Sequence, residues 1–179
     1  RFKGHVLLPR KPTAATNDHV GELKNITEFQ VTGEASSNIY ALFADGDLYK
    51  YQNTNDEWPA SAAFNLTNPT SETIVFTDST PTSYLIFAQG DTGYSYTTNG
   101  TSATNKTASG DKVDYFAVWH GTLWGISKAG VLKNWASGPT NTPTLKAQIP
   151  LPNGYVTSLM VYRDAGGSPI IYAATKVGL

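Results

Sequence analysis

Short runs of consecutive apolar residues recur along the chain, each followed by a glycine-containing turn and a strand that alternates aromatic with polar residues. The clearest example is YALFADGDLYKY at 40–51. It recurs as YLIFAQGDTGYSY at 84–96, LWGISKAGVLKNW at 123–135 and IYAATKVGL at 171–179. Apolar runs this short predict strands that are covered on both faces, and the glycines predict tight turns. The pattern therefore predicts four β-hairpins.

Further segments place each hairpin in a larger repeat. An apolar segment precedes each hairpin, at 26–31, 73–76, 113–119 and 156–162. A more polar, extended segment follows the first three, at 57–64, 101–107 and 142–150. Aromatic residues fall at matching points: Tyr40, Tyr84, Trp124 and Tyr172. The unit is four antiparallel strands over about 40 to 45 residues, the length expected of a propeller blade.

We therefore predict an all-β chain, residues 1–179 forming a single β-propeller region of four-stranded antiparallel blades. The predicted blades are 26–66, 72–107, 112–150 and a partial 155–179, with residues 1–11 as the outer strand of a preceding or closing blade. The N-terminal strand either closes a small four-bladed ring, or the chain is an arc of a larger propeller. We expect the arc, because the last repeat stops where its third strand should begin. A β-sandwich with irregular strands is the alternative fold.

Four turns carry specific expectations. Asp45–Gly46 predicts a two-residue type I′ hairpin, which needs positive φ at its central residues, and Gly90–Asp91 and His120–Gly121 predict similar turns. Ala129–Gly130 suits a three-residue loop with a bulge. Acidic residues in such turns, including Asp45, Asp47 and Asp91, are expected to bond the local backbone rather than to act as acid and base.

Composition excludes several classes of function. The net charge is −1, only 15% of residues are charged, and Lys and Arg form no basic stripe, which argues against nucleic-acid binding. No apolar run approaches the roughly 20 residues that span a bilayer, so we expect no membrane insertion. The chain has no cysteine, which excludes disulfides, thiolate metal sites and a cysteine nucleophile.

Motifs for catalysis or metal binding are missing. His5, His19 and His120 lie in separate segments without metal-ligand spacing, and the oxygen-rich stretch 53–57 lacks the glycine and carboxylates of a calcium loop. There is no nucleophile elbow, P-loop or dinucleotide fingerprint. We predict no catalytic residues, no metal, no cofactor and no enzymatic activity.

The tryptophans are the candidate ligand-binding residues, because an aromatic ring can stack on a sugar. Trp119 and Trp124 lie inside apolar strands and are expected to pack in the core. Trp58 and Trp135 lie near strand ends before polar loops, so they are the better candidates for an exposed ring, and the ligand-binding residues stay unassigned. Asn-x-Ser/Thr sequons occur at Asn25, Asn65, Asn99 and Asn105, and they imply glycosylation only in a secreted eukaryotic protein.

The repeating phrases IYALFADGDLYKY and VTSLMVY…IIYAATKVGL resemble β-propeller blades in general, without the signatures of WD40, kelch or sialidase-like blades. LYKYQNTNDEW is similar to the tachylectin-type lectin repeat, but the other blades do not keep it. The low-charge texture, rich in Thr, Asn, Ser, Gly and Tyr, is similar to propeller domains of bacteriophage tail and nozzle proteins.

That resemblance implies a non-enzymatic structural or interaction propeller, located in a virion tail or another extracellular assembly and binding protein partners. Two alternatives stay open. One is a propeller lectin that binds a host-surface glycan. The other is part of a propeller enzyme whose catalytic residues lie outside this chain.

Overall fold

The computed structural model describes residues 22–52, 58–59, 61–163 and 165–177. These residues form four antiparallel sheets of four, four, four and two strands, each following chain order. Sheet 1 contains β1 (Leu23–Phe29), β2 (Asn38–Phe43), β3 (Asp47–Lys50) and β4 (Phe64–Asn65). Sheet 2 contains β5 (Thr73–Thr77), β6 (Ser83–Ala88), β7 (Tyr94–Thr97) and β8 (Thr104–Lys106).

Sheet 3 contains β9 (Tyr115–Trp119), β10 (Thr122–Ile126), β11 (Val131–Trp135) and β12 (Thr144–Gln148). Sheet 4 is a hairpin of β13 (Gly154–Arg163) and β14 (Pro169–Val177). One 3₁₀ turn, Ser109–Asp111, precedes sheet 3. The all-β prediction and the grouping into four-stranded units are confirmed. The predicted outer strand at 1–11 lies outside the described residues.

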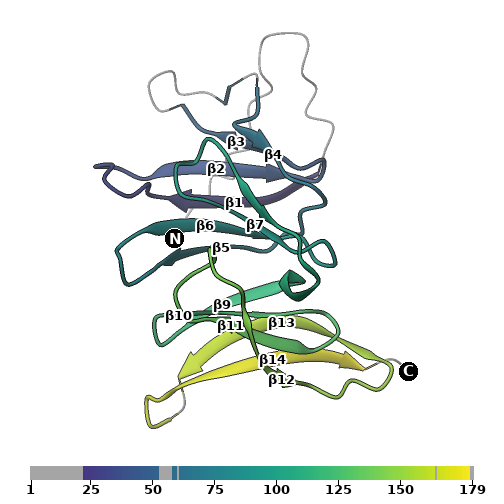
Figure 1. Cartoon of the computed structure of the whole chain (residues 1–179). Helices are drawn as coiled ribbons and strands as arrows, with labels where there is room; N and C mark the ends of the chain where they lie inside the picture. The colour runs from purple at the N-terminus through teal and green to yellow at the C-terminus, as the bar shows by residue number, and fades with distance from the viewer. Residues whose placement is uncertain (1–21, 53–57, 60, 164, 178–179) are drawn as a thin grey trace, which may run out of the picture.

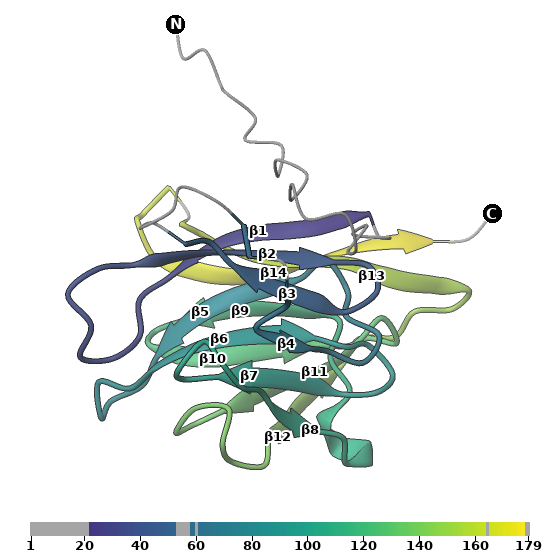
Figure 2. The same ribbon diagram turned by 90° about the horizontal axis from the view of Figure 1, so that it is seen from above.

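The sheets stack face to face in chain order, as Figure 1 shows from the purple sheet 1 to the yellow hairpin of sheet 4. The first strands lie together, because β1 contacts β5, β5 contacts β9 and β9 contacts β13. Figure 2 shows the later strands β8 and β12 on the opposite side of the stack from β1. None of the four sheets closes on itself within the described residues. Sheets 2 and 3 are covered on both faces, which a two-layer sandwich does not provide.

Sheets 1 and 2 share an apolar core. Tyr40 and Leu42 of β2 pack against Leu85 and Phe87 of β6, and all four are buried. Polar contacts reinforce this junction: Asn25 Nδ2 donates to the carbonyl oxygen of Ser71 at 2.7 Å. Each fully covered aromatic or aliphatic side chain contributes about 1.5 to 3 kcal/mol of burial free energy, so the junction is held mainly by these side chains.

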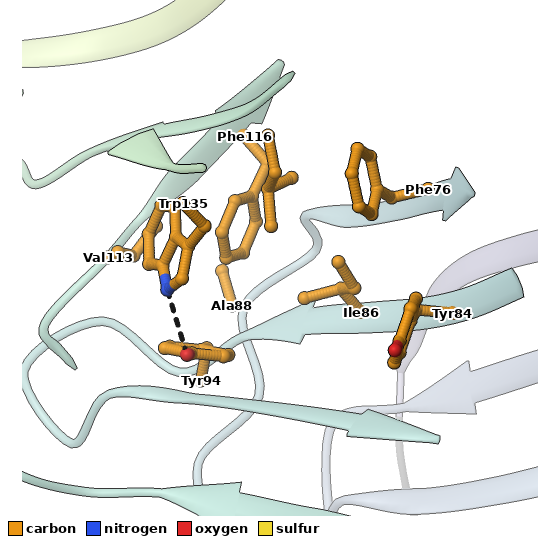
Figure 3. Packing of buried hydrophobic residues seen from close by; sticks show 9 residues of the cluster. Phe76, Tyr84, Ile86, Ala88, Tyr94, Val113, Phe116 and Trp135 are labelled. Atoms are coloured by element: carbon orange, nitrogen blue, oxygen red, sulfur yellow. Dashed lines mark hydrogen bonds between the residues drawn. The ribbon is translucent and has the colours of Figure 1, made fainter. Parts of the chain in front are cut away.

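Sheets 2 and 3 share the largest aromatic cluster, shown in Figure 3. Tyr94 of β7 and Trp135 of β11 meet edge to face with ring centroids 5.3 Å apart. The indole Nε1 of Trp135 donates to the Tyr94 hydroxyl at 2.9 Å, drawn as the dashed line in Figure 3. That hydroxyl in turn donates to the carbonyl oxygen of Pro139 at 2.7 Å. Both polar groups of the two buried rings are therefore satisfied across the junction.

Sheets 3 and 4 meet through a smaller core. Ile126 and Ala117 pack against Val156 and Leu159, with Trp124 partly buried against them. The packing of Trp124 confirms the expectation from its place in an apolar strand. Ile171 and Ala173 of β14 face the same core. Because side chains alternate along a strand, the even-numbered residues of β14 point to the opposite face of sheet 4.

The third strand of each four-stranded sheet follows a turn closed by a left-handed glycine: Gly46, Gly93 and Gly130, with φ of 98°, 117° and 84°. A Cβ atom at Gly46 would overlap the carbonyl oxygen of Leu66, and one at Gly93 would overlap that of Lys106. The glycine is therefore needed both for its φ and for the close approach of the fourth strand.

The type I′ prediction at Asp45–Gly46 is wrong, because only Gly46 of the pair has positive φ. Gly46 N donates to Phe43 O at 3.1 Å, and Asp45 Oδ1 accepts the backbone N–H of Asp47 at 3.1 Å. The turn is type I followed by a left-handed glycine, stabilised by the Asp45 side chain.

The prediction at Gly90–Asp91 is also wrong: Gly90 has a φ of 57° but Asp91 has no positive φ, and Gln89 N donates to Gly93 O at 3.0 Å across a longer loop. The remaining two turn predictions are confirmed. His120 and Gly121 have φ of 51° and 69° between the paired residues Trp119 and Thr122, as a type I′ turn requires. Gly130 closes the predicted bulged loop. The first strand begins at Leu23 rather than at residue 26, because Leu23 pairs with Phe43 across a bulge.

Candidate functional site

The repeated aromatic residues of the second strands all point toward the following sheet. Tyr40 contacts sheet 2, Tyr84 lies in the cluster shared with sheet 3, and Trp124 packs toward sheet 4. Tyr40 and Tyr84 are 1% and 5% exposed. The recurrence in the sequence therefore marks one structural role, which is to fill the space between a sheet and its successor.

Tyr172 is the fourth member of this series, and nothing covers it within the described residues. Because Ile171 and Ala173 face sheet 3, strand alternation places Tyr172 on the opposite face. Its paired residue Met160 lies there too, beside the paired Tyr162 and Ile170. Tyr172 is 45% exposed and Tyr162 is 65% exposed. We call Met160, Tyr162, Ile170 and Tyr172 the terminal face.

The terminal face is organised rather than a scatter of single residues. Tyr162 and Tyr172 meet edge to face with ring centroids 6.4 Å apart. The four side chains come from two adjacent cross-strand pairs of one hairpin, so they form a continuous surface. An exposed, continuous apolar surface of this kind marks an interaction site in a soluble protein. The terminal face is therefore the candidate functional site.

The opposite end of the stack, the outer face of sheet 1, is partly covered by its own chain. Ala41, Phe43 and Tyr49 form a buried cluster on the outer face of sheet 1. Leu23, Trp58 and Ala62 pack against that cluster. Phe43 and Tyr49 meet edge to face with centroids 5.6 Å apart. Ile26 and Ile39 stay exposed on this outer face, so among the described residues the two ends of the stack differ in how much of their apolar surface is covered.

The two tryptophans predicted to be exposed have different fates. The prediction for Trp135 is wrong: its side chain is fully buried, because the alternation of β11 turns it into the core between sheets 2 and 3. Trp58 is half-buried, and its ring lies 5.2 Å from that of Tyr51 in an edge-to-face pair. Sugar stacking by Trp58 stays a prediction.

Two surface hollows lie away from the terminal face. One, of about 540 Å³, is lined by Asn38, Lys50, Tyr51, Gln52, Pro59, Ser61 and Ala63 beside sheet 1. The other, of about 460 Å³, lies where the turns of sheets 2 and 3 meet and includes Lys112, Lys128 and Lys133. The ammonium of Lys133 donates to the carbonyl oxygens of Gly110 and Lys112, and burial lowers the pKa of Lys133. These bonds anchor the loop that leads into sheet 3.

Glu72 is a half-buried carboxyl group at the junction of sheets 2 and 3. Desolvation raises the pKa of Glu72, while Oε1 accepts the backbone N–H of Phe116 at 3.3 Å, which opposes that shift. The bond links the start of β5 to β9, so Glu72 joins sheet 2 to sheet 3.

Among the described residues, no group of three or more His, Asp or Glu side chains has a geometry that could hold a metal ion. Asp91 lies 3.8 Å from Lys112 in an exposed ion pair.

All four sequon asparagines take part in side-chain hydrogen bonds: Asn25 to Ser71, Asn65 to Asp47, Asn99 within its own turn, and Asn105 to Ser95. No helix in the part of the chain that the structure describes is long and apolar enough to span a membrane.

No protein-family model matches the chain, and a search of curated proteins gave no match. Functional assignment therefore depends on the geometry above.

Sequence reasoning missed the terminal face, although it found the aromatic residue at its centre. Tyr172 was grouped correctly with Tyr40, Tyr84 and Trp124, but the direction in which it points became visible only from the partners of its neighbours. The available signal was the apolar character of both faces of β13 and β14, at the last repeat of the series.

Proposed function

We propose that this chain is a non-enzymatic structural and interaction protein, an arc of β-propeller blades that takes part in a larger assembly through its terminal face. The observation that carries the proposal is the series Tyr40, Tyr84, Trp124 and Tyr172. The first three pack into the following sheet, and the fourth is exposed at an equivalent position.

The sheet arrangement supports blades rather than separate hairpins. Each four-stranded sheet runs in chain order, and the first strands of successive sheets touch. That order is the one expected when antiparallel blades stack around a common axis. In such a protein, rigidity comes from aromatic packing between blades, and connecting loops present surface to partners.

The most concrete setting for such a protein is a tail component of a virion or another extracellular assembly, with protein partners. The composition supports this setting: low charge, no cysteine and abundant Thr, Asn, Ser, Gly and Tyr. The chain's role would be mechanical, holding neighbouring subunits in fixed orientation.

The proposal is tested by isolating the chain under native conditions from the cells or particles that make it. Sedimentation should place it in an assembly several times heavier than the polypeptide that carries it. Oxidative footprinting should show that Tyr172 is protected there. A polypeptide that sediments alone in its native extract would refute the assembly role.

Carbohydrate binding is the second candidate function, favoured by the hollow of about 540 Å³ that Tyr51 lines and by the Tyr51–Trp58 ring pair next to it. Aromatic rings beside polar groups such as Asn38 and Ser61 suit a sugar. A glycan array tests it: the wild-type chain should bind one glycan class, and Tyr51→Ala should abolish binding while Leu145→Ala should not. An array without binding removes this candidate.

A further inference from the structure

Two asparagines in the chain, Asn99 and Asn153, are followed directly by glycine. Such a pair can react with itself, because glycine has no Cβ to hinder the approach of its backbone nitrogen to the side-chain amide. We propose that Asn153 is a site of spontaneous deamidation that loosens the junction of sheets 3 and 4, and that the fold protects Asn99 from the same reaction. This modification is independent of the assembly role.

The reaction consumes only water. A solvent base removes the proton of the Gly154 amide, and the nitrogen forms a bond to Cγ of Asn153. The side-chain nitrogen takes a proton from water and leaves as ammonia, and the cyclic succinimide that remains is then opened by water. Opening at Cγ gives aspartate, whereas opening at the backbone carbonyl gives isoaspartate, whose main chain runs through Cβ and Cγ. Either product carries a new negative charge at neutral pH.

Both reacting groups at Asn153 are available. The side chain is exposed and makes no hydrogen bond with any residue that the structure describes. The Gly154 N–H donates to the carbonyl oxygen of Leu151 at 3.3 Å, which is longer than the usual range for such a bond. Asn153 also has a left-handed φ of 56°, a conformation that is unfavourable for a residue with a Cβ. The turn therefore offers little resistance to the movement that the reaction needs.

Asn99 is exposed as well, but hydrogen bonds hold both of its reacting groups. Its Oδ1 accepts the backbone N–H groups of Thr101 and Ser102 at 2.9 and 3.1 Å. Its Nδ2 donates to Ser102 Oγ at 3.1 Å. The Gly100 N–H donates at 2.9 Å to the hydroxyl of Thr97, which is buried. These bonds must break before the Gly100 nitrogen can reach Cγ of Asn99.

The difference in hydrogen bonding sets the expected difference in rate. Gly100 is buried, and a Cβ at that position would overlap the Tyr40 hydroxyl, so this turn has little room to rearrange. Loss of one buried hydrogen bond corresponds to a factor of about ten or more, since a tenfold rate change is about 1.4 kcal/mol. In the folded chain, Asn153 should therefore deamidate at least about tenfold faster than Asn99.

The modified turn lies where sheet 4 joins sheet 3. Gly154 begins β13, and two residues later the Val156 N–H donates to the carbonyl oxygen of Lys128 in sheet 3 at 2.9 Å. The Val156 side chain is fully buried in the core that the two sheets share. Isoaspartate lengthens the main chain immediately before these contacts. The isoaspartate form should therefore unfold at a lower urea concentration than the aspartate form.

Peptide mass spectrometry tests the proposal after incubation of the folded chain at mildly alkaline pH in water enriched in heavy oxygen. Incorporated heavy oxygen marks each deamidation, and fragmentation assigns it to a residue. The label should appear at Asn153 at least about tenfold faster than at Asn99. The same chain in concentrated urea is the matched control. There the two rates should converge, because both sites have the same local sequence and neither keeps its folded contacts.

Two substitutions at Thr97 test the protection of Asn99. Thr97→Ala removes the acceptor of the Gly100 N–H, so it should speed the reaction at Asn99 by roughly tenfold and leave Asn153 unchanged. Thr97→Ser keeps a hydroxyl and should keep the protection. The comparison in urea needs no substitution, so it decides the proposal even if Thr97→Ala does not fold.

Ageing experiments test the effect on the junction. After incubation, the wild type should unfold at a lower urea concentration than before. Asn153→Gly should show no such change, because it lacks the reactive amide and glycine suits the left-handed φ. Equal rates at Asn99 and Asn153 in the folded chain, or a faster reaction at Asn99, would overturn the assignment of the site. An unchanged urea midpoint after Asn153 has reacted would overturn the loosening of the junction.

Discussion

Tyr94→Phe is the substitution that most sharply tests how sheets 2 and 3 are held together. The Tyr94 hydroxyl accepts the indole N–H of Trp135 at 2.9 Å and donates to Pro139 O at 2.7 Å. Phenylalanine keeps the ring and its edge-to-face contacts with Phe116 and Trp135. It removes only the oxygen, and it leaves a buried N–H and a buried carbonyl without their partner.

Each buried polar group left unpaired costs about 1 to 3 kcal/mol. Trp135 is fully buried, so we expect Tyr94→Phe to lower the free energy of unfolding by about 3 kcal/mol. For a chain of this length, that corresponds to a melting temperature lower by roughly 6 to 12 °C. Urea unfolding followed by tryptophan fluorescence measures the change.

Tyr40→Phe is the matched control, because Tyr40 is equally buried but its hydroxyl has no hydrogen-bond partner among the residues that the structure describes. Because it removes an unpaired buried hydroxyl, it should raise the free energy of unfolding, by up to about 3 kcal/mol, the opposite sign to Tyr94→Phe. The double variant Tyr94→Phe/Trp135→Phe should show coupling of at least about 1 kcal/mol between the two sites. A loss below about 1 kcal/mol for Tyr94→Phe, or additive single effects, would refute the reasoning.

Three further predictions concern other parts of the stack. Burial and the nearby Glu34 carboxylate raise the pKa of Tyr40 to about 12, above its ordinary value of 10.0. The free energy of unfolding should therefore be highest below pH 10 and fall as pH rises toward 12, and urea unfolding at a series of pH values should show a smaller fall in Tyr40→Phe. Gly93→Ala should lower the free energy of unfolding by at least about 2 kcal/mol in urea, because the new Cβ overlaps the backbone of Lys106 at positive φ; an unchanged midpoint would contradict the turn geometry. Burial raises the pKa of Glu72, so the contribution of Glu72 to the free energy of unfolding is greatest at acidic pH and falls as pH rises through the folded pKa. Glu72→Gln keeps the acceptor for the Phe116 N–H, so its free energy of unfolding should match or exceed that of the wild type at pH 7, and the two values should become equal in acid.

The hairpins and their grouping were predictable because they depend on local signals. The apolar runs at Tyr40–Phe43 and Tyr84–Ala88 are short, and glycines at 46, 93 and 130 interrupt the pattern where φ must be positive. Such signals act over a few residues and do not depend on distant contacts. They therefore identify strands and turns, including the type I′ turn at His120–Gly121.

The direction of each side chain was not predictable in the same way. A strand that is apolar on both faces shows no alternation from which to assign them. Trp135 illustrates this: its position near a strand end suggested exposure, but the packing of β11 against sheet 2 buries it. The covering of sheet 1 by Trp58 and Ala62 also depends on contacts between segments that are distant in the sequence. Consequently the terminal face could be found only from the stacked structure.

Hydroxyl-radical footprinting of the tyrosines tests the central claim most directly. The claim is that Tyr40, Tyr84 and Tyr172 hold equivalent positions between stacked sheets, and that only the last is uncovered in the single chain. In the dilute monomer, Tyr172 should oxidise much faster than Tyr40 and Tyr84, and in the associated state its rate should fall toward theirs. Rapid oxidation of Tyr40 or Tyr84 in the folded monomer, or an unchanged rate at Tyr172 after association, would contradict the account.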